Sequence, residues 1–463
     1  MTHYRLLVIG GGTGGLRTAL AAAKMGHTVC LVEPGVLGGT CLNTGCIPTK
    51  AMLHASLLYR GMKGLRKYGI IPGTVKLDMK RMMRHVHSFI EDGEEHIAKG
   101  MKHYPNLTLV KDRATFVNES TVLAGGREIS ADNIIISTGA SNVRPQVEGL
   151  TEFLDNESVI NLEKLPKSIA MIGGGYISME FATFFSDMGC KVHVIEKFPK
   201  ILGMLDDDIV DLLTSIYEGR GVSLRTSTNI VHVKKKKGGY RILLNESSRP
   251  YHSKYLDVEQ VLVAIGRHPN THDLGLEKAG VQVGDRHGIT INDRMQTTNP
   301  RVYAIGDVTG RAMFAHAVKR ESRIILDNIF SGKDERMNFD LVPWAVFTDP
   351  AVAGVGIGEK AAIDKKIDYG VLKAPFSKDG RAAIMGNTEG FVKVLYDRQS
   401  RAILGATIIG PDADDLIHEI SVIMYAGAKV DVIHEAVHIH PTLAEVMEEL
   451  REEKDEHPEA RKE

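Results

Sequence analysis

Two stretches of the chain repeat one pattern of apolar and polar positions. The first begins with the apolar run RLLVIG at Arg5, continues through GGTGG and an alanine-rich helical segment, and ends with TVCLVE at Glu33. The second begins with SIAMIG at Ser168, continues through GGYIS and another helical segment, and ends with KVHVIE at Glu196. Short β-branched runs bounded by glycine are typical of buried strands. The pattern therefore predicts two β-α-β units.

The glycines in both turns have the spacing of a dinucleotide-binding fingerprint: Gly10, Gly12 and Gly15 in the first unit, and Gly173 and Gly175 in the second. Ser178 takes the place of the third glycine in the second unit, a mild departure because serine is small. The first glycine permits a tight turn, the second lets the backbone approach a pyrophosphate, and the third lets helix and strand pack closely. Glu33 and Glu196 end the second strands, close to the expected spacing of about 20 residues. The chain is therefore predicted to bind two dinucleotides.

Further apolar runs divide the rest of the chain. The segments DNIIISTGA (132–140), VLVAIGRHPN (261–270) and NPRVYAIGD (299–307) read as buried strands, and an amphipathic helix is expected over 312–330. From about Phe339 the pattern changes to alternating strands such as GFVKVLYD, and a last helical stretch covers Thr442 to Leu450. This order predicts an α/β protein with two nested Rossmann-like domains and a C-terminal α+β domain.

The positions of these strands also give the expected domain boundaries. The first nucleotide domain is predicted to be discontinuous, with residues 1–145 and 268–338, around a second nucleotide domain at 146–267 and before a separate domain at 339–463. Four lysines at 234–237 precede two glycines, which predicts a solvated hairpin turn and not a nucleic-acid contact. The charged tail from Arg451 contains Pro458 and is expected to fray.

Composition narrows the class of protein. The 463 residues carry 57 Lys plus Arg against 58 Asp plus Glu, a net charge of −1, so no global positive field would attract nucleic acid or an anionic membrane. No apolar run reaches the roughly 18 residues that a membrane span needs. Four cysteines in so long a chain cannot form a disulfide framework of the secreted kind. We expect a cytoplasmic protein without a metal site.

Two of the cysteines lie in the segment GGTCLNTGCIPTK, which runs from Gly38 to Lys50. On a regular helix the five-residue spacing of Cys41 and Cys46 would separate them by about 7.5 Å, which exceeds the Cα distance of roughly 7 Å that a disulfide tolerates. A bridge therefore needs a non-helical turn, for which Asn43 and Gly45 are suited. Such a bridge at a helix N-terminus would be easily reduced, because the helix end stabilises a thiolate. Two unpaired structural thiols are the alternative, while Cys30 and Cys190 fall in or beside buried strands and are expected to be inert.

A second cluster of reactive side chains lies near the C-terminus, in HIHPTLAEVMEEL, with His438, His440 and Glu445. Histidine carries protons near neutral pH, and a carboxylate on one ring nitrogen orients the ring and raises its pKa. Glu445 is placed so that it can turn back towards His440. A purely structural histidine is the competing interpretation of the His440–Pro441 pair.

Taken together, these motifs resemble the two-cysteine flavoprotein disulfide oxidoreductases over essentially the whole chain. The most specific matches are GGTCLNTGCIPTK, GGGYISME, VYAIGD and HIHPTLAE. The resemblance implies a homodimer with FAD on the first fingerprint and the nicotinamide cofactor NAD on the second. It implies FAD contacts at Gly10, Gly12, Gly15, Glu33, Gly39, Thr40, Lys50, Thr138, Gly139, Gly306 and Asp307, and NAD contacts at Gly173, Gly175, Glu196 and Gly266.

The resemblance also implies the catalytic roles. Cys46 would be the thiolate nearer the flavin and Cys41 the thiol that exchanges with substrate. Lys50 would lie beside the flavin with Glu180 as its ion-pair partner. His440, held by Glu445, would be supplied across the subunit interface.

Within the family, the chain most resembles enzymes that oxidise dihydrolipoamide with NAD, whose lipoyl group is carried by a 2-oxo acid dehydrogenase or glycine-cleavage complex. Four alternatives remain. Glutathione-type reductases use NADP, to which Glu196 is unsuited because it repels a 2′-phosphate, although Lys197 weakens the argument. Mercuric reductases carry a C-terminal cysteine pair, whereas the last cysteine here is Cys190. The third alternative, a diaphorase, would need neither Cys41 nor His440. The fourth is a protein whose main task is assembly into a multienzyme complex, and binding to an acyltransferase core would reveal it.

Overall fold

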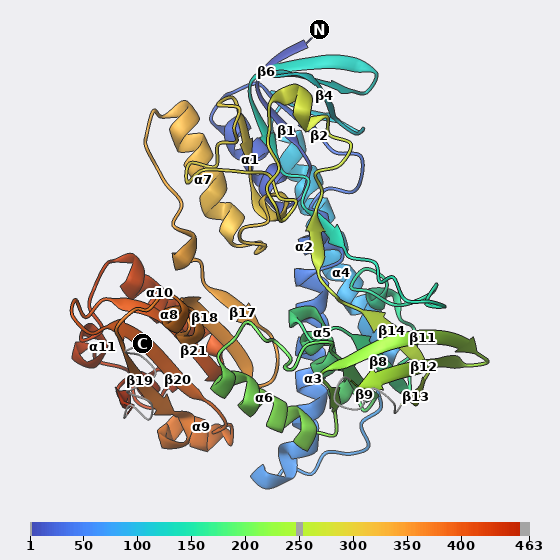
Figure 1. Cartoon of the computed structure of the whole chain (residues 1–463), viewed down its shortest axis with the longest axis vertical. Helices are drawn as coiled ribbons and strands as arrows, with labels where there is room; N and C mark the ends of the chain where they lie inside the picture. Colours follow the sequence, from blue (N-terminus) through green and yellow to red (C-terminus); the bar gives the residue numbers. More distant parts are fainter. Residues whose placement is uncertain (1, 247–252, 454–463) are drawn as a thin grey trace.

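The computed structural model describes residues 2–246 and 253–453. Figure 1 shows an upper lobe that contains the N-terminus, a lower lobe around α5 and β8, and a C-terminal lobe around α10 and β21. The chain runs from the upper lobe into the second lobe, returns to the upper lobe, and then enters the C-terminal lobe. The nested order predicted from the strand pattern is therefore seen in the arrangement of the sheets.

The upper lobe is built on a seven-stranded sheet in the order β3-β2-β1-β6-β5-β4, with β16 also paired to β6. Its strands are β1 (Thr2–Ile9), β2 (Val29–Val32), β3 (Leu107–Val110), β4 (Thr115–Asn118), β5 (Thr121–Ala124), β6 (Arg127–Ile136) and β16 (Val302–Ala304). The β1, β2, β3, β6 and β16 pairings are parallel. Helices α1 (Thr13–Lys24) and α7 (Ala317–Phe330) pack against each other beside this sheet. The apolar runs at Leu6 and Ile134 form its core because they are buried on both faces.

The second lobe contains a four-stranded parallel sheet in the order β10-β9-β8-β14. Its elements are β8 (Ser168–Ile172), α5 (Tyr176–Asp187), β9 (Lys191–Ile195), α6 (Asp207–Gly219), β10 (Ser223–Arg225) and β14 (Gln260–Val263). An antiparallel sheet of β11 (Thr228–Lys236), β12 (Gly239–Glu246) and β13 (Ser253–Val258) lies beside it. Lys236 pairs with Gly239 across the turn, so the hairpin predicted for the lysine run is confirmed.

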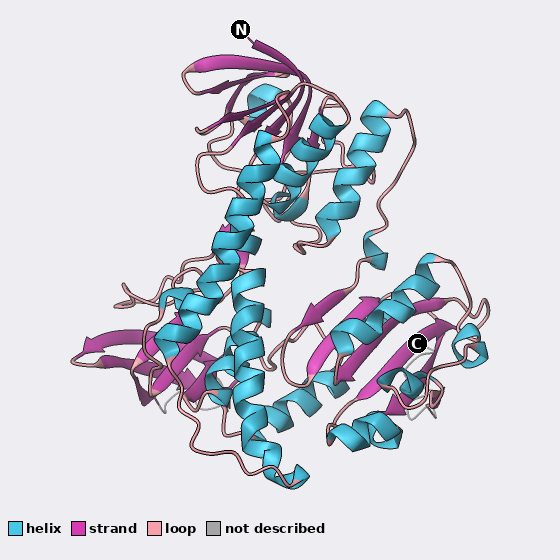
Figure 2. Cartoon of the chain, turned by 180° about the vertical axis from the view of Figure 1, so that it is seen from behind, coloured by secondary structure: helices cyan, strands magenta, loops and turns pink. Residues whose placement is uncertain are grey.

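Between these lobes, two crossing segments pair as β7 (Ala140–Asn142) and β15 (Arg267–Pro269). The cysteine segment forms α2 (Gly39–Asn43) and α3 (Cys46–Gly64), followed by η1 (Leu65–Tyr68) and α4 (Met79–Lys102). Figure 2 shows the two long helices running from the upper lobe towards the bottom of the molecule. Since α3 packs on α5 as well as on α4, it joins the first nucleotide unit to the second.

The C-terminal lobe is an antiparallel sheet in the order β17-β18-β21-β20-β19-β22. Its strands are β17 (Trp344–Val346), β18 (Ala351–Gly356), β19 (Tyr369–Pro375), β20 (Phe391–Asp397), β21 (Ile403–Gly410) and β22 (Arg451–Glu452). Its helices are α8 (Glu359–Asp364), α9 (Gly380–Met385), α10 (Ala413–Tyr425) and α11 (Val432–Glu435). Short 3₁₀ turns complete the chain: η2 (Val159–Asn161), η3 (Leu276–Ala279), η4 (Gly306–Thr309), η5 (Phe339–Leu341), η6 (Phe376–Lys378) and η7 (Leu443–Met447).

The predicted fold class is confirmed, but three local predictions are wrong. The helix expected from residue 312 begins at Ala317, and the residues before it form a loop of which 313–315 line a cavity. The helix expected over 442–450 is the shorter η7. The tail does not fray at its start, since Arg451 pairs with Lys373 of β19, while residues 454–463 lie outside the described part of the chain. The exact domain boundaries stay a prediction.

Within residues 2–246 and 253–453, no helix is both long and apolar enough to cross a membrane. The longest helix, α4, has a strongly one-sided apolar face with only Met79, Met83 and Val86 fully buried. Helix α4 therefore packs against the rest of the protein with one face and exposes the other face to solvent.

Candidate active site

A cavity of about 1910 Å³ lies where the two nucleotide lobes and the C-terminal lobe meet. It brings together most of the residues that the sequence singled out: Gly10, Gly12, Glu33, Gly39, Thr40, Cys41, Cys46, Lys50, Thr138, Gly139, Gly173, Gly175, Glu180, Glu196, Gly266, Gly306 and Asp307. Gly15, His440 and Glu445 are not among its lining residues. One continuous space therefore connects both glycine loops with the cysteine pair.

The first glycine loop is held in its shape by its own strand and by Glu33. Gly10 has φ +104°, and a side chain there would collide with the carbonyl of Ser137. A side chain at Gly15 would collide with the carbonyl of Gly10, which explains why Gly15 packs behind the loop and does not line the cavity. The Glu33 carboxylate accepts from the N–H of Gly11 at 2.6 Å and from that of Gly35 at 2.7 Å.

The first loop also presents free hydrogen-bond donors to the cavity. Helix α1 begins after Gly12, and no side chain caps the helix. Its first N–H groups therefore have no partner from a cap and carry the positive end of the helix dipole. A glycine cradle, uncapped N–H groups and an acidic residue at the end of β2 fit the pyrophosphate and ribose of a dinucleotide.

The second loop repeats this construction around Glu196. The Glu196 carboxylate accepts from the N–H of Gly174 at 2.5 Å and from that of Phe198 at 2.8 Å. Helix α5 begins after Gly175 without a side-chain cap. Ser178, in place of the third glycine, is fully buried, and its hydroxyl has no hydrogen-bond partner among the residues that the structure describes. The same donor set thus fits a second dinucleotide in the lower half of the cavity.

The cysteine pair lies at the start of α3, where the chain turns between two helices. Helix α2 ends at Asn43, and Gly45 precedes Cys46, the first residue of α3, so the expected non-helical turn is present. This turn brings the two thiols together, and the Cys41 thiol hydrogen-bonds to Cys46. The redox-active bridge between Cys41 and Cys46 stays a prediction, which this contact supports.

The two thiols differ in acidity. The hydrogen bond from Cys41 is the largest influence on Cys46 and, with the charge of Lys50, lowers the pKa of Cys46 to about 7 against the effect of burial. The same hydrogen bond and burial raise the pKa of Cys41 far above its usual range. Cys46 is therefore the member that ionises near neutral pH, as the helix N-terminus also favours. Cys30 and Cys190 are buried, and burial raises their pKa values to about 11 and about 12, which disfavours the reactive thiolate.

Lys50 and Glu180 meet across the contact between α3 and α5. The Lys50 ammonium donates to both Glu180 oxygens, at 3.0 and 2.9 Å. The C-terminal lobe adds a residue that the sequence did not reveal: the N–H of Phe347 donates to Glu180 at 3.1 Å, and the ring centre of Phe347 is 4.3 Å from Lys50 Nζ. No local pattern marks Phe347, because its partners are distant in sequence and only the fold brings them together.

Asp307 follows β16 at the cavity wall, 3.8 Å from the Arg267 guanidinium. Burial raises the pKa of the Asp307 carboxyl, and Arg267 opposes that effect. The neighbouring Glu321 on α7 is fully buried, accepts from the N–H of Gly306 at 2.8 Å, and has its pKa raised to about 7 by burial. The sequence analysis missed Glu321, although an acidic residue on the apolar face of an amphipathic helix was a usable signal.

His440 and Glu445 form the expected pair on the surface of the C-terminal lobe. His440 Nδ1 lies 2.8 Å from one Glu445 oxygen, and the N–H of Thr442 donates to the other at 2.8 Å. These contacts, with the backbone hydrogen bond the larger, lower the pKa of Glu445. The His440 side chain is 81% exposed, so its second ring nitrogen is free to reach another molecule.

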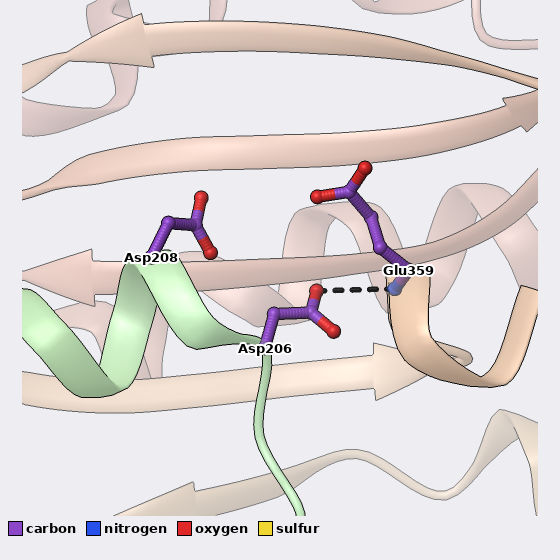
Figure 3. Close-up of side chains that lie close together, drawn as sticks. All are labelled: Asp206, Asp208 and Glu359. Atoms are coloured by element: carbon purple, nitrogen blue, oxygen red, sulfur yellow. Dashed lines mark hydrogen bonds between the residues drawn. The ribbon is translucent and has the colours of Figure 1, made fainter. Parts of the chain in front are cut away.

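A group of three carboxylates elsewhere has the spacing of a metal site. Figure 3 shows Asp206, Asp208 and Glu359 facing one another, with the N–H of Glu359 donating to Asp206. Lys393 Nζ lies 2.8 Å from Asp206 and Asp208 and 2.9 Å from Glu359. Lys393 is fully buried, so its ammonium takes the position a cation would need and links α6 to the C-terminal lobe.

Comparison with known proteins agrees with this geometry. The pyridine nucleotide-disulphide oxidoreductase family matches residues 4–322, and its dimerisation domain matches residues 342–451. Dihydrolipoyl dehydrogenase of Thermus scotoductus is 36% identical over 459 residues, covering 98% of this chain and 97% of its own length. That of Geobacillus stearothermophilus is 33% identical over 454 residues, covering 96% and 95%.

A solved structure is also similar over the whole chain. It is the Cu(II) complex of the HOCl-induced flavoprotein disulfide reductase RclA from Escherichia coli, with a TM-score of 0.85, 29% sequence identity, and coverage of 97% of this chain and 98% of that one. Both kinds of relative therefore extend over all three lobes.

The fold and the cavity define a redox enzyme that couples a thiol pair to two dinucleotides. The chain belongs to the pyridine nucleotide-disulphide oxidoreductase family, which confirms the resemblance drawn from its motifs. It is a flavoprotein oxidoreductase with FAD and NAD(H) as its cofactors, and its dimerisation domain supports a homodimer.

Proposed function

We propose that the protein is a dihydrolipoyl dehydrogenase, which oxidises dihydrolipoamide and reduces NAD⁺. The observation that carries this proposal is the acidified Cys46 thiol in contact with Cys41, inside a cavity that both glycine loops share. The curated relatives with this activity, at 33% and 36% identity, support it. The partner would be the lipoyl domain of a 2-oxo acid dehydrogenase or glycine-cleavage complex.

The thiol chemistry follows from the two cysteines. In the oxidised enzyme Cys41 and Cys46 are bonded, and a substrate thiolate attacks the Cys41 sulfur, so that the disulfide breaks and Cys46 leaves as a thiolate. The second substrate sulfur then displaces Cys41, which yields cyclic lipoamide and a Cys41 thiol. Of the two substrate protons, His440 takes one and Cys41 keeps the other. Cys46 is suited to be the leaving group because the lower-pKa thiol leaves faster.

The remaining site residues would bind the cofactors and place a positive charge beside the cysteines. When bound, FAD would take the electron pair from the cysteines and pass it to NAD⁺ as hydride, chemistry that no side chain supplies. Its contacts would come from the first glycine loop, Glu33 and Asp307, while Lys50, held by Glu180, would present a positive charge beside Cys46. His440 with Glu445 would serve the sulfur side from the neighbouring subunit.

Preference for NAD over NADP would come from Glu196. A carboxylate can accept from a ribose 2′-hydroxyl but repels a 2′-phosphate. The nearby Lys200 is already committed to Asp207 and Asp211, at 3.0 and 2.7 Å. Lys197 lies over the Phe198 ring, with 4.7 Å between its ammonium and the ring centre. The charge of Lys200 is thus offset by two carboxylates, whereas Lys197 keeps a positive charge next to Glu196.

A second candidate is a reductase of another disulfide, favoured by the similarity to RclA, whose solved complex holds Cu(II). Thiolates such as those of Cys41 and Cys46 are soft donors that select Cu(I), the product of Cu(II) reduction. This candidate would not need a lipoyl partner, and it predicts NAD(P)H-dependent reduction of a disulfide or of Cu(II) faster than dihydrolipoamide turnover.

Steady-state assays of the FAD-loaded enzyme separate these candidates. We expect kcat/KM to be highest for dihydrolipoamide with NAD⁺, and at least a hundredfold lower with NADP⁺, a difference of about 3 kcal/mol. Glutathione disulfide and Cu(II), each supplied with NADH or NADPH, are the comparison substrates. A higher kcat/KM for either of them, or equal use of both coenzymes, would contradict the proposal.

A further inference from the structure

His438, two residues before His440, is held in a way that the proposed reaction does not use. Its Nδ1 lies 3.0 Å from Glu448 Oε1, and its Nε2 lies 3.1 Å from Glu419 Oε1. Only 7% of the His438 side chain is exposed, against 81% for His440. The two histidines of one short motif therefore occupy opposite environments.

The two contacts determine the protonation state of His438. A neutral imidazole has one N–H and one lone pair, so one of its nitrogens would direct a lone pair at a carboxylate oxygen. An imidazolium donates from both nitrogens and satisfies both carboxylates. The backbone N–H of His438 also donates to Glu448 Oε1, at 3.2 Å, so the same carboxylate holds the main chain.

These contacts tie the segment to two elements at once. Glu419 belongs to α10, whereas Glu448 directly follows η7, the turn that also supplies Glu445 to His440. His438 faces inward, and Val437 and Ile439 are 95% and 77% exposed. The inward anchor at His438 therefore sets the position of the residue that follows Ile439.

We propose that His438 is a positioning residue: a protonated imidazole, clamped between Glu419 and Glu448, that fixes the segment carrying His440. The inference rests on the proposed function for its catalytic consequence, but not for the clamp itself. The titratable groups around His438 are Glu419 from α10, Glu448 and Glu445 at the η7 turn, and His440 from its own segment.

The clamp is sensitive to pH. Burial is the largest influence and lowers the pKa of His438, but hydrogen bonds and charge from Glu419 and Glu448 outweigh it, so the pKa is raised above its ordinary value of 6.5. A group whose pKa is raised by folding stabilises the folded state fully below its unfolded pKa. That stabilisation is lost as the pH rises through the folded pKa. The clamp should therefore release on the alkaline side.

The direct test is an NMR titration of the FAD-loaded dimer with ¹³C-labelled histidine rings, in which the His438 signal is assigned by its loss in His438→Asn. In the wild-type protein its midpoint should lie above about 6.5. Glu419→Gln keeps the size of the side chain but removes its charge, and it should lower the midpoint. Glu419→Asp should keep a value nearer to wild type, and Glu449→Gln, a neighbouring carboxylate that does not contact His438, should leave it unchanged. A wild-type midpoint at or below the ordinary value would overturn the proposal.

The second readout concerns turnover and remains available if His438→Asn does not fold. In Glu419→Gln, kcat for dihydrolipoamide should begin to fall at lower pH than in wild type, by severalfold at pH 8, while electron passage from NADH to a dye stays unchanged. An alkaline limb that moves equally in Glu449→Gln, or equal loss of the NADH–dye reaction, would refute the positioning role. If the wild-type enzyme does not turn over dihydrolipoamide at all, the proposed function fails, and the NMR titration still decides whether the clamp exists.

Discussion

The cysteine pair and His440, to which we assign the thiol and proton chemistry, lie in opposite surroundings. Cys41 and Cys46 face the cavity between the nucleotide loops, and residues from α2, α3 and α5 surround them. His440 lies on the surface of the C-terminal lobe and does not line that cavity. In the proposed function, the electron-transfer half of the site therefore lies inside one chain, and the proton-transfer half lies on the surface of the dimerisation domain. Substitutions in the two regions should therefore separate the half-reactions.

The largest effect is expected from the cysteines. Cys41→Ser and Cys46→Ser should each reduce dihydrolipoamide oxidation by on the order of 10³-fold or more, because members of one chemical unit cannot act alone. The double variant should be no worse than either single one. Electron passage from NADH to an artificial dye needs no dithiol and should survive. Measurable dihydrolipoamide turnover in Cys46→Ser would contradict the dithiol mechanism.

His440→Ala should have the next largest effect, on the sulfur side alone. General acid–base catalysis contributes about 10²–10⁴-fold, so dihydrolipoamide oxidation should slow by that factor. NADH–dye electron transfer should be nearly intact, since His440 is outside the cavity. Equal loss of both activities in a folded, FAD-loaded variant would refute the assignment.

Mixed dimers test whether the two regions meet across subunits. When inactive His440→Ala chains are combined with inactive Cys46→Ser chains, one intact composite site per heterodimer should form, and activity should return. A mixture of His440→Ala chains with Cys30→Ser chains, which keep both Cys46 and His440, is a control for subunit exchange. Absence of rescue after proven exchange would place His440 at the site of its own chain.

Glu445→Ala should give a smaller loss than His440→Ala. One Glu445 oxygen contacts Nδ1 of His440 and orients the ring, and the other accepts a hydrogen bond from the N–H of Thr442. Glu445 itself transfers no proton in the proposed reaction. We expect the loss of dihydrolipoamide turnover to stay below about a hundredfold, the lower end of general acid–base effects. Glu449→Gln, with its charge nearby but no contact to His440, is the matched control in the same assay.

The two regions also differ in how far the sequence could predict them. The β-α-β units and the cysteine turn follow from local patterns, namely apolar runs, glycine spacing and a proline near the start of α3. The His440–Glu445 contact was likewise within reach, because the two residues are close in sequence. Such features depend on backbone geometry over a few residues, and that is what a single sequence encodes directly.

Contacts between distant segments could not be predicted in this way. The role of Phe347 beside Lys50 and Glu180 requires the C-terminal lobe to be placed against α5. The Lys393 cluster and the pairing of Arg451 with β19 depend in the same way on which elements become neighbours. His438 was visible as a histidine, but its two carboxylate partners come from different elements, and only the fold reveals that it is clamped and not free.

The smallest expected effect concerns the acidity of Cys46 and tests whether the cavity region works as a charged unit. In the reduced enzyme, the rate of Cys46 alkylation by iodoacetamide should rise as the pH increases through about 7 and then level off, because the pKa of Cys46 is lowered to that value and only the thiolate reacts. Lys50→Met removes a positive charge and leaves the Glu180 carboxylate unpaired. Both changes disfavour the thiolate, so the midpoint should move to higher pH.

Glu180→Gln changes the charge in the opposite sense and should move the midpoint to lower pH, since Glu180 raises the pKa of Cys46. Lys63→Met is the control, because Lys63 lies on the same helix as Lys50 but donates to the Asp187 carbonyl. This variant should leave the midpoint of Cys46 alkylation unchanged. Mass spectrometry of the labelled peptide measures each rate and distinguishes Cys46 from Cys41. Shifts of opposite sign in the two variants are the signature of an electrostatic effect, because a general loosening of the site would move both midpoints in one direction. An unchanged midpoint in both would mean that Cys46 ionises through Cys41 and the helix end alone.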